Sequence, residues 1–171
     1  MGHQAHEELA RATGSGQIRC GILTLSDTRT PATDTSGAAI RAALTQAGHH
    51  VVRYAIVRDE PEAIIALVRA AAAEEIKLLI TNGGTGITRR DSTIEALDTL
   101  FEKRLPGFGE LFRMLSYQAI GAAAMLSRAT AGVYAGMLIF CLPGATAAVT
   151  LGLETLIIPQ AAHLVWETTR Q

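Results

Sequence analysis

The sequence predicts an α/β fold of three layers, in which helices cover both faces of a mostly parallel sheet. Apolar segments of strand length alternate with segments of helical spacing along the chain, and this alternation is typical of an open parallel sheet. The run Leu78–Ile80 has the composition of a strand buried on both faces. The 171 residues are enough for one domain with a sizeable core.

The first strand and helix are predicted near the N-terminus. The apolar run Ile18–Ser26 is expected to form the first strand. A helix is expected to begin at an N-cap, either Asp34 or Thr35, and to continue to about Gln46. Gly48 follows it and is a common helix-stopping residue.

A second strand–helix unit and a third strand follow. His50–Val57 shows partial alternation of apolar and polar residues and is predicted as a strand. Pro61 stands where a helix begins, and Glu62–Glu75 has helical spacing with an alanine-rich body. Lys77–Thr81 is predicted as the third strand.

The middle of the chain is predicted to be helical. A capping box, Ser92 with Glu95, opens a helix expected through Lys103, and Pro106-Gly107 breaks it. Two further helical segments are expected over Gly109–Ala119 and Ala122–Leu126.

The C-terminal third is predicted to hold a hairpin and two helices. Ala131–Tyr134 and Met137–Leu142 are short apolar runs separated by two turn residues, so they are expected to pair as a hairpin. Helices are expected over Ala145–Ile158 and Gln160–Thr168, separated by Pro159.

Composition limits the kind of protein. The net charge is −1, so a broad basic surface for nucleic acid is not expected. Apolar stretches are of strand length or are interrupted by charge, so no membrane span is predicted. Residues 1–16 are expected to be a disordered polar tail without a secretory signal, and residues 17–171 a single domain. Cys20 and Cys141 are predicted to be buried, reduced thiols of a cytoplasmic protein rather than zinc ligands.

The turn after the third strand predicts a site for phosphate. Gly83, Gly84 and Gly86 allow the backbone to turn tightly and to expose its N–H groups, which attract anions. No Gly-Lys-Ser/Thr closes the turn, so it is not a P-loop. Arg89 stands where the third glycine of the dinucleotide-binding fingerprint would be.

Polar or flexible residues follow four of the predicted strands. They are Ser26-Asp27, Asp59, Gly83–Asp91 and Pro143-Gly144. Ligands of open α/β sheets bind outside the carboxyl ends of the strands. These residues are therefore expected to converge on one site.

The glycine turn and the residues after it resemble the MoaB/MogA family of molybdenum cofactor biosynthesis proteins. Thr81–Gly86 stands in the place of the family's T-x-G-G-T-G, and Arg90–Ala96 in that of R-D-x-T-P-E-A. The middle of the chain is more similar to MoaB than to MogA. Further similar blocks, in the family's order and spacing, are Leu25–Gly37, Pro106–Arg113, Leu115–Gly121, Leu126–Gly132 and Ile139–Gly144.

The resemblance implies that the chain binds molybdopterin and adenylylates its terminal phosphate with Mg²⁺ and ATP, releasing pyrophosphate. It implies that Asp59 and Asp91 are catalytic and hold the Mg²⁺, and that the product passes to a metal-inserting protein. The residues implied to bind ligand are Ser26, Asp27, Gly83, Gly84, Thr85, Gly86, Arg90, Ser116, Ser127, Pro143 and Gly144.

The residues alone leave other roles open. Asp91 and Asp59 could each cap the helix that follows, as aspartate often does. Ser127 could cap a helix end, and Arg128 could form an ion pair.

The chain also departs from the family pattern. Ile94 replaces the proline of R-D-x-T-P-E-A, Asn82 stands where Thr, Ser or Gly is usual, and no lysine follows Gly144 closely. The missing lysine favours an alternative, a non-catalytic molybdopterin-binding or carrier protein. A third alternative is a generic phosphate-binding domain that shares the fold, as the competence-damage-inducible protein domain does. The family also implies a homo-oligomer, trimer or hexamer, for which the apolar Gly107–Leu115 segment could supply a contact.

Overall fold

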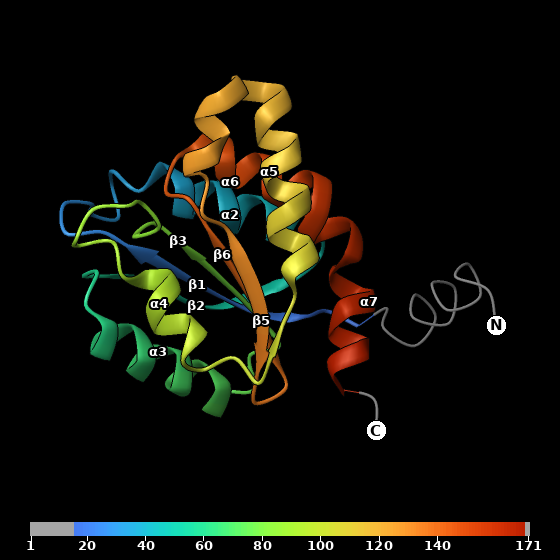
Figure 1. The fold of residues 1–171 in the computed structure, drawn as a ribbon. Coiled ribbons are helices and arrows are strands. Elements are labelled where there is room, and N and C mark those ends of the chain that lie inside the picture. The colour runs from blue at the N-terminus through green and yellow to red at the C-terminus, as the bar shows by residue number, and fades with distance from the viewer. Residues whose placement is uncertain (1–15, 170–171) are drawn as a thin grey trace.

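A computed structural model describes residues 16–169 and shows helices on both sides of one sheet (Figure 1). The strands are β1 (Arg19–Leu25), β2 (His50–Val57), β3 (Leu78–Asn82), β4 (Lys103–Arg104), β5 (Thr130–Tyr134) and β6 (Met137–Leu142). They form a six-stranded sheet in the order β2-β1-β3-β6-β5-β4. The α/β fold class predicted from the sequence is confirmed.

Four neighbouring strands of the sheet, β2, β1, β3 and β6, are joined by parallel pairing. β1 pairs in parallel with both β2 and β3, and β3 pairs in parallel with β6. β5 and β4 complete one edge by antiparallel pairing, and β5 with β6 is the predicted hairpin. The carboxyl ends of β1, β2, β3 and β6 therefore lie at one edge of the sheet, where the sequence predicted the site.

The helices divide between the two faces of the sheet according to the apolar clusters they join. One face carries α2 (Thr35–Gln46), α5 (Pro106–Ile120), α6 (Thr146–Gly152) and α7 (Ile158–Thr169). The other carries α3 (Pro61–Ala73) and α4 (Thr93–Asp98). Asp34 is the N-cap of α2, because its carboxylate accepts a hydrogen bond from the Gly37 N–H at 2.9 Å.

The central strands are buried on both faces, which explains their continuous apolar sequences. In β6, alternate residues enter opposite clusters: Leu138, Phe140 and Leu142 pack with α2, α5 and α6, whereas Met137, Ile139 and Cys141 pack with α3 and α4. All six are buried. Each fully buried side chain of this size stabilises the fold by about 1.5–3 kcal/mol, so β6 is a major part of the core.

The helix predicted to run from the capping box to Lys103 is shorter in the structure. α4 ends at Asp98, and Lys103 lies in β4, where it pairs with Val133 of β5. Edge pairing with β5 therefore outweighs helical propensity here. The prediction of a capping box is also wrong. Ser92 is the N-cap of α4, but its side chain forms no cap hydrogen bond, and its hydroxyl donates to Asp59 at 3.2 Å instead.

Pro106 begins a helix rather than breaking one. It stands in the first turn of α5, where its missing N–H would have no helical partner. The segment predicted as a second helix is a 3-10 helix, η1 (Gly121–Leu126). Gly121 has φ +66°, which ends α5 and turns the chain into η1.

The predicted break at Pro159 is absent. The chain stays helical from Thr146 to Thr169, because a π-helical segment, η2 (Leu153–Ile157), precedes the proline, and the Ile158 N–H bonds to the Leu153 carbonyl. By length and composition alone this run is long and apolar enough to cross a membrane. Its side chains Val149, Leu153, Ile157 and Ala161 belong to the buried core.

Both cysteines have the predicted environment. Cys20 and Cys141 are free and buried, and burial raises the pKa of each thiol to about 12. The predicted polar tail falls almost wholly on residues 1–15, which lie outside the described part of the chain.

Candidate functional site

The exits of the four parallel strands touch one another through backbone atoms. The Gly83 N–H donates to the Leu142 carbonyl at 3.0 Å, and the Ser26 N–H donates to the Val57 carbonyl at 2.8 Å. Gly144 packs so closely on the glycine turn that a Cβ added to it would lie 3.3 Å from the Gly83 Cα. The convergence expected for these segments is therefore present in the structure.

The glycine turn is packed too tightly for side chains at its first two positions. Gly83 and Gly84 have φ values of +98° and +61°, which favour glycine. A Cβ on Gly83 would overlap the Leu25 carbonyl oxygen, and a Cβ on Gly84 would overlap Thr93 Oγ1 and Asp59 Oδ2. The turn thus packs against the end of β1, the loop after β2 and the start of α4.

The carbonyl side of the turn is held by an arginine that follows η1. Arg128 Nε donates to the Thr85 carbonyl at 2.9 Å. Its Nη1 and Nη2 donate to the two carboxylate oxygens of Glu95 at 2.6 Å and 3.3 Å. The hydrogen bond from Glu95 raises the pKa of Arg128 further. Arg128 therefore forms the ion pair that the sequence left open and also fixes the turn to α4.

Asp59 lies against Gly84 and is partly buried. Its Oδ1 accepts hydrogen bonds from Ser92 Oγ and Thr93 Oγ1, both at 3.2 Å. Burial raises the pKa of Asp59 above its ordinary value of 3.8 despite these bonds, and the charge of Asp91 adds to the rise. Asp59 does not cap α3, whose N-cap is Glu60.

Asp91 lies beside Gly86, the last residue of the turn. Its Oδ2 accepts hydrogen bonds from the Thr88 N–H at 2.9 Å and from the Thr88 hydroxyl at 2.6 Å. The hydroxyl bond is the main cause that lowers the pKa of Asp91. A Cβ on Gly86 would lie 2.6 Å from the same oxygen. Asp91 closes its own turn rather than capping α4, whose N-cap is Ser92.

The two aspartates are the groups of this site that suit a metal ion. Their carboxylates repel each other enough to affect the pKa of Asp59, and neither forms an ion pair within residues 16–169. In the same residues no group of three or more His, Cys, Asp or Glu side chains is placed to hold a metal. One or two carboxylates with ligand phosphates and water are the usual environment of Mg²⁺, so the chemistry of these two side chains is compatible with that ion.

Arg90 and Asp27 form an ion pair at the edge of the site. Arg90 Nη2 lies 3.0 Å from Asp27 Oδ2, with the two side chains 83% and 36% exposed. Ser26 takes part in the turn after β1, where its hydroxyl oxygen accepts the Thr28 and Arg29 N–H groups at 3.3 Å and 3.1 Å. Solvent screens the exposed ion pair between Arg90 and Asp27, so Asp27 holds Arg90 only weakly.

The two predicted serines are not joined to the glycine turn. Ser116 lies on the buried face of α5, and Ser127 ends η1 with its N–H bonded to the Ala124 carbonyl at 2.9 Å. No hydrogen bond among the described residues links either serine to residues 83–86. Ser127 reaches the site only as the neighbour of Arg128.

A buried polar network behind the site was missed by the sequence analysis. The Asp34 carboxylate accepts hydrogen bonds from Thr24 Oγ1 at 2.6 Å and from the Tyr54 hydroxyl at 2.7 Å. Asn82 Nδ2 donates to Thr24 Oγ1 at 3.0 Å and joins β3 to the network. Burial alone would raise the pKa of Asp34, but the hydrogen bonds from Thr24, Gly37 and Tyr54 hold it below its ordinary value. The signal lies in the block Leu25–Gly37, where the sequence predicts only a helix-capping role for Asp34.

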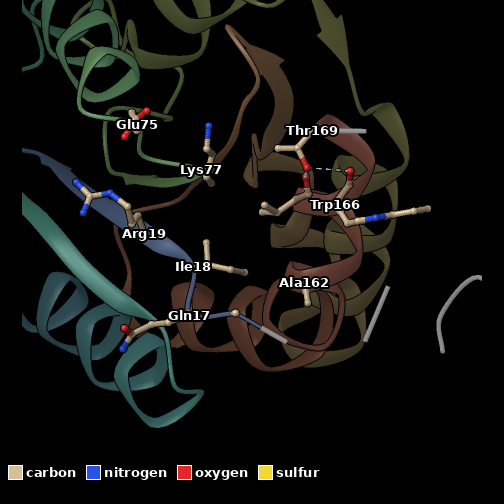
Figure 2. A pocket seen from close by; sticks show the side chains of 10 residues that line it. Gln17, Ile18, Arg19, Glu75, Lys77, Ala162, Trp166 and Thr169 are labelled. Carbon is tan, nitrogen blue, oxygen red and sulfur yellow. Dashed lines mark hydrogen bonds between the residues drawn. The ribbon is translucent and has the colours of Figure 1, made fainter. Parts of the chain in front are cut away.

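A separate cavity lies at the opposite end of the sheet. It has a volume of about 330 Å³ and is lined at the starts of β1 and β3 by Ile18, Arg19 and Lys77, and from α7 by Ala162 and Trp166 (Figure 2). None of the residues predicted to bind ligand lines it. It therefore forms no part of the site at the strand exits.

Comparison with known proteins agrees with this geometry. A family model described as a probable molybdopterin binding domain, MoCF_biosynth, matches residues 21–163, which include all four strand exits. The chain belongs to this family. The molybdenum cofactor biosynthesis protein B of Bacillus subtilis (strain 168) is 51% identical over 152 residues, covering 88% of this chain and 89% of that protein.

Solved structures of the family superpose closely. A crystal structure of molybdenum cofactor biosynthesis protein B has a TM-score of 0.89 and 47% identity, covering 91% of this chain and 98% of that one. The tungsten cofactor synthesizing protein MoaB from Pyrococcus furiosus has a TM-score of 0.82 and 38% identity, covering 90% and 98%. The resemblance to MoaB proteins drawn from the motifs is confirmed.

Proposed function

We propose that this protein binds molybdopterin at the strand exits and transfers AMP from ATP to its terminal phosphate in the biosynthesis of the molybdenum cofactor. An oxygen of the molybdopterin phosphate attacks the α-phosphorus of ATP, and the bond between the α- and β-phosphates breaks. The products are adenylylated molybdopterin and pyrophosphate. The observation that carries the proposal is the glycine turn held between two carboxylates at the meeting point of four parallel strands.

The glycine turn would hold phosphate. Gly83, Gly84 and Gly86 remain partly exposed although they are tightly packed on one side, so a ligand would approach the turn from its exposed side. The turn is fixed by Arg128 on the Thr85 carbonyl and by Leu142 on the Gly83 N–H. The Gly83 N–H is occupied by its bond to Leu142, so other N–H groups of the turn would bind the phosphate. Donors held rigidly stabilise charge that develops during transfer without reorganising.

Asp59, beside Gly84, and Asp91, beside Gly86, would hold Mg²⁺ next to the turn. The ion neutralises phosphate charge when bound and so assists group transfer. The repulsion between the two carboxylates, which adds to the rise in the pKa of Asp59, favours binding of a cation between them. Ser92 and Thr93 orient the Asp59 carboxylate through their hydroxyl groups.

A second candidate is a protein that binds molybdopterin without catalysis. Residues 145–148, after the Gly144 turn, contain no lysine, and the third carboxylate or histidine of a stronger metal site is absent from the described residues. A weak metal site would leave binding intact and slow the transfer.

The deciding experiment is incubation of the protein with molybdopterin, Mg²⁺ and ATP under anaerobic conditions, with the product followed by chromatography. Asp91→Asn tests the site, and Asp98→Asn is the matched control, because Asp98 pairs with Arg104 away from the strand exits. We expect product from the wild type and the control, and little from Asp91→Asn. Binding without product would support the second candidate. Absence of binding would refute both.

The exposed face of α5 and η1 would support a homo-oligomer. Within the predicted contact segment Phe108 and Phe112 are buried in the core, but Leu111 and Met114 are exposed. The exposed apolar set continues with Tyr117, Ile120, Met125 and Leu126. Contiguous exposed apolar residues commonly mark protein contacts. Light scattering of Met114→Glu, with Glu110→Gln as the control, tests this contact. If the exposed face joins the subunits of a trimer or hexamer, the molar mass of the particle should fall in Met114→Glu and stay unchanged in Glu110→Gln.

We further propose a cytoplasmic protein that delivers its product to a metal-inserting partner. Free, buried thiols suit a reducing compartment. Crosslinking of the product-bound protein to candidate metal-inserting proteins tests the transfer. An equal crosslinking yield without product would count against delivery.

A further inference from the structure

The loop between β1 and α2 carries an arginine, Arg29, that is fixed at several points. Its Nη2 donates to the Gly144 carbonyl at 2.8 Å, and its Nη1 pairs with Asp34 Oδ1 at 3.1 Å. Nη1 also bonds to Ser36 Oγ. The Arg29 backbone N–H is bonded to Ser26 Oγ at 3.1 Å. One guanidinium therefore ties the exit of β1 to the exit of β6.

The acid that orients this guanidinium is itself immobilised. The side chain of Asp34 has no solvent exposure, and Thr24, Tyr54 and Gly37 donate to it at 2.6, 2.7 and 2.9 Å. These donors come from β1, β2 and α2. A buried, fully bonded carboxylate fixes the plane of its arginine, whereas the exposed Arg90 pair is free to rearrange.

Arg29 keeps donors for a ligand. A guanidinium has five N–H groups, and the bonds to Asp34, Ser36 and Gly144 use three of them. Within residues 16–169 no acceptor is bonded to Nε. The side chain remains 27% exposed, and its partner Gly144 packs directly on Gly83 of the glycine turn. An anion on that turn therefore lies within reach of a fixed cation.

We propose that Arg29 is a ligand-binding residue, and that its free N–H groups bind the anionic group held by the glycine turn. This inference rests on the proposed function, because it assumes that the turn holds a phosphate. Arginine presents paired donors that match phosphate oxygens, and a guanidinium oriented in advance loses little freedom on binding. Arg90, which the sequence suggested for this role, lacks such support.

Titration calorimetry with pyrophosphate and with molybdopterin, each without ATP, tests the inference. Arg29→Gln removes the charge, and Arg29→Lys keeps the charge but not the paired donors. Arg104→Gln is the matched control, because it breaks an exposed Arg–Asp pair of 2.9 Å remote from the site. We expect Arg29→Gln to weaken both ligands about 10- to 100-fold, the range for loss of hydrogen bonds to a charged group. Arg29→Lys should show a smaller loss, and Arg104→Gln none.

Thermal melting separates binding from folding. Arg29→Lys should melt near the wild type and still bind less tightly, which a purely structural role would not produce. Wild-type affinity in both Arg29 variants would overturn the inference and leave the proposed function standing. Weakened pyrophosphate binding in a protein that never binds molybdopterin would support the inference and refute the proposed function. A wild type that binds neither ligand would overturn both.

Discussion

Gly84→Ala should be one of the most damaging single-methyl changes in this chain. Gly84 has φ +61°, a conformation that costs a residue with a side chain about 1–2 kcal/mol. The new Cβ would also overlap Thr93 Oγ1 and Asp59 Oδ2, and forced packing of this kind costs about 1–3 kcal/mol. The free energy of unfolding should therefore fall by about 2–5 kcal/mol. At roughly 2–4 °C per kcal/mol for a chain of this length, Tm should fall by about 4–20 °C.

Two other glycines separate the two causes. Gly136 has φ +72° but open space around its Cα, so Gly136→Ala should show only the conformational cost. Gly107 has open space and no positive φ, so Gly107→Ala should be neutral or stabilising by up to about 1 kcal/mol. Urea unfolding of all three variants measures the differences. If Gly84→Ala loses no more stability than Gly136→Ala, the close packing between the glycine turn and Asp59 is refuted.

Further predictions concern the core and the titrating groups. Asp34→Asn should lower the free energy of unfolding by about 3 kcal/mol in urea; because the pKa of Asp34 is lowered by folding, the difference from wild type should shrink as pH falls below the ordinary 3.8. Phe112→Ala should cost about 3–5 kcal/mol, since Phe112 is fully buried. Iodoacetamide at pH 8 should label Cys20 and Cys141 only after unfolding, because burial raises each pKa to about 12; labelling of the folded protein would contradict this. Mg²⁺ affinity, followed by calorimetry, should decline in acid at pH values above 3.8, where Asp59, with its raised pKa, takes up a proton.

Local patterns were enough to predict most of the sheet. The bounds of β2 and β6 are those predicted. β6 is an uninterrupted apolar run that follows two turn residues, whereas β2 is recognised by its partial alternation of apolar and polar residues. The failures lie where tertiary pairing decides. Lys103 leaves a helical pattern to pair with β5, and Pro159 stays within a helix because a π-helical turn precedes it.

The site was predictable where it is made of backbone, and less so where it is made of distant side chains. Glycines after a buried strand indicate a turn by their type alone. The partnership of Arg29 with Gly144 joins residues 115 positions apart, and the hold of Arg128 on Thr85 joins residues 43 apart. No periodicity encodes such pairs, so a single sequence could name Arg128 only as the possible member of an ion pair.

The position of β6 between β3 and β5 determines when the binding turn can form during synthesis. The Gly83 N–H bonds to Leu142, at the last residue of the last strand to leave the ribosome. Until β6 inserts beside β3, the glycine turn of the nascent chain lacks its hydrogen bond to Leu142. Under the proposed function, a growing chain would not capture ligand early, and truncation before residue 142 should abolish binding even if the first three parallel strands have already associated.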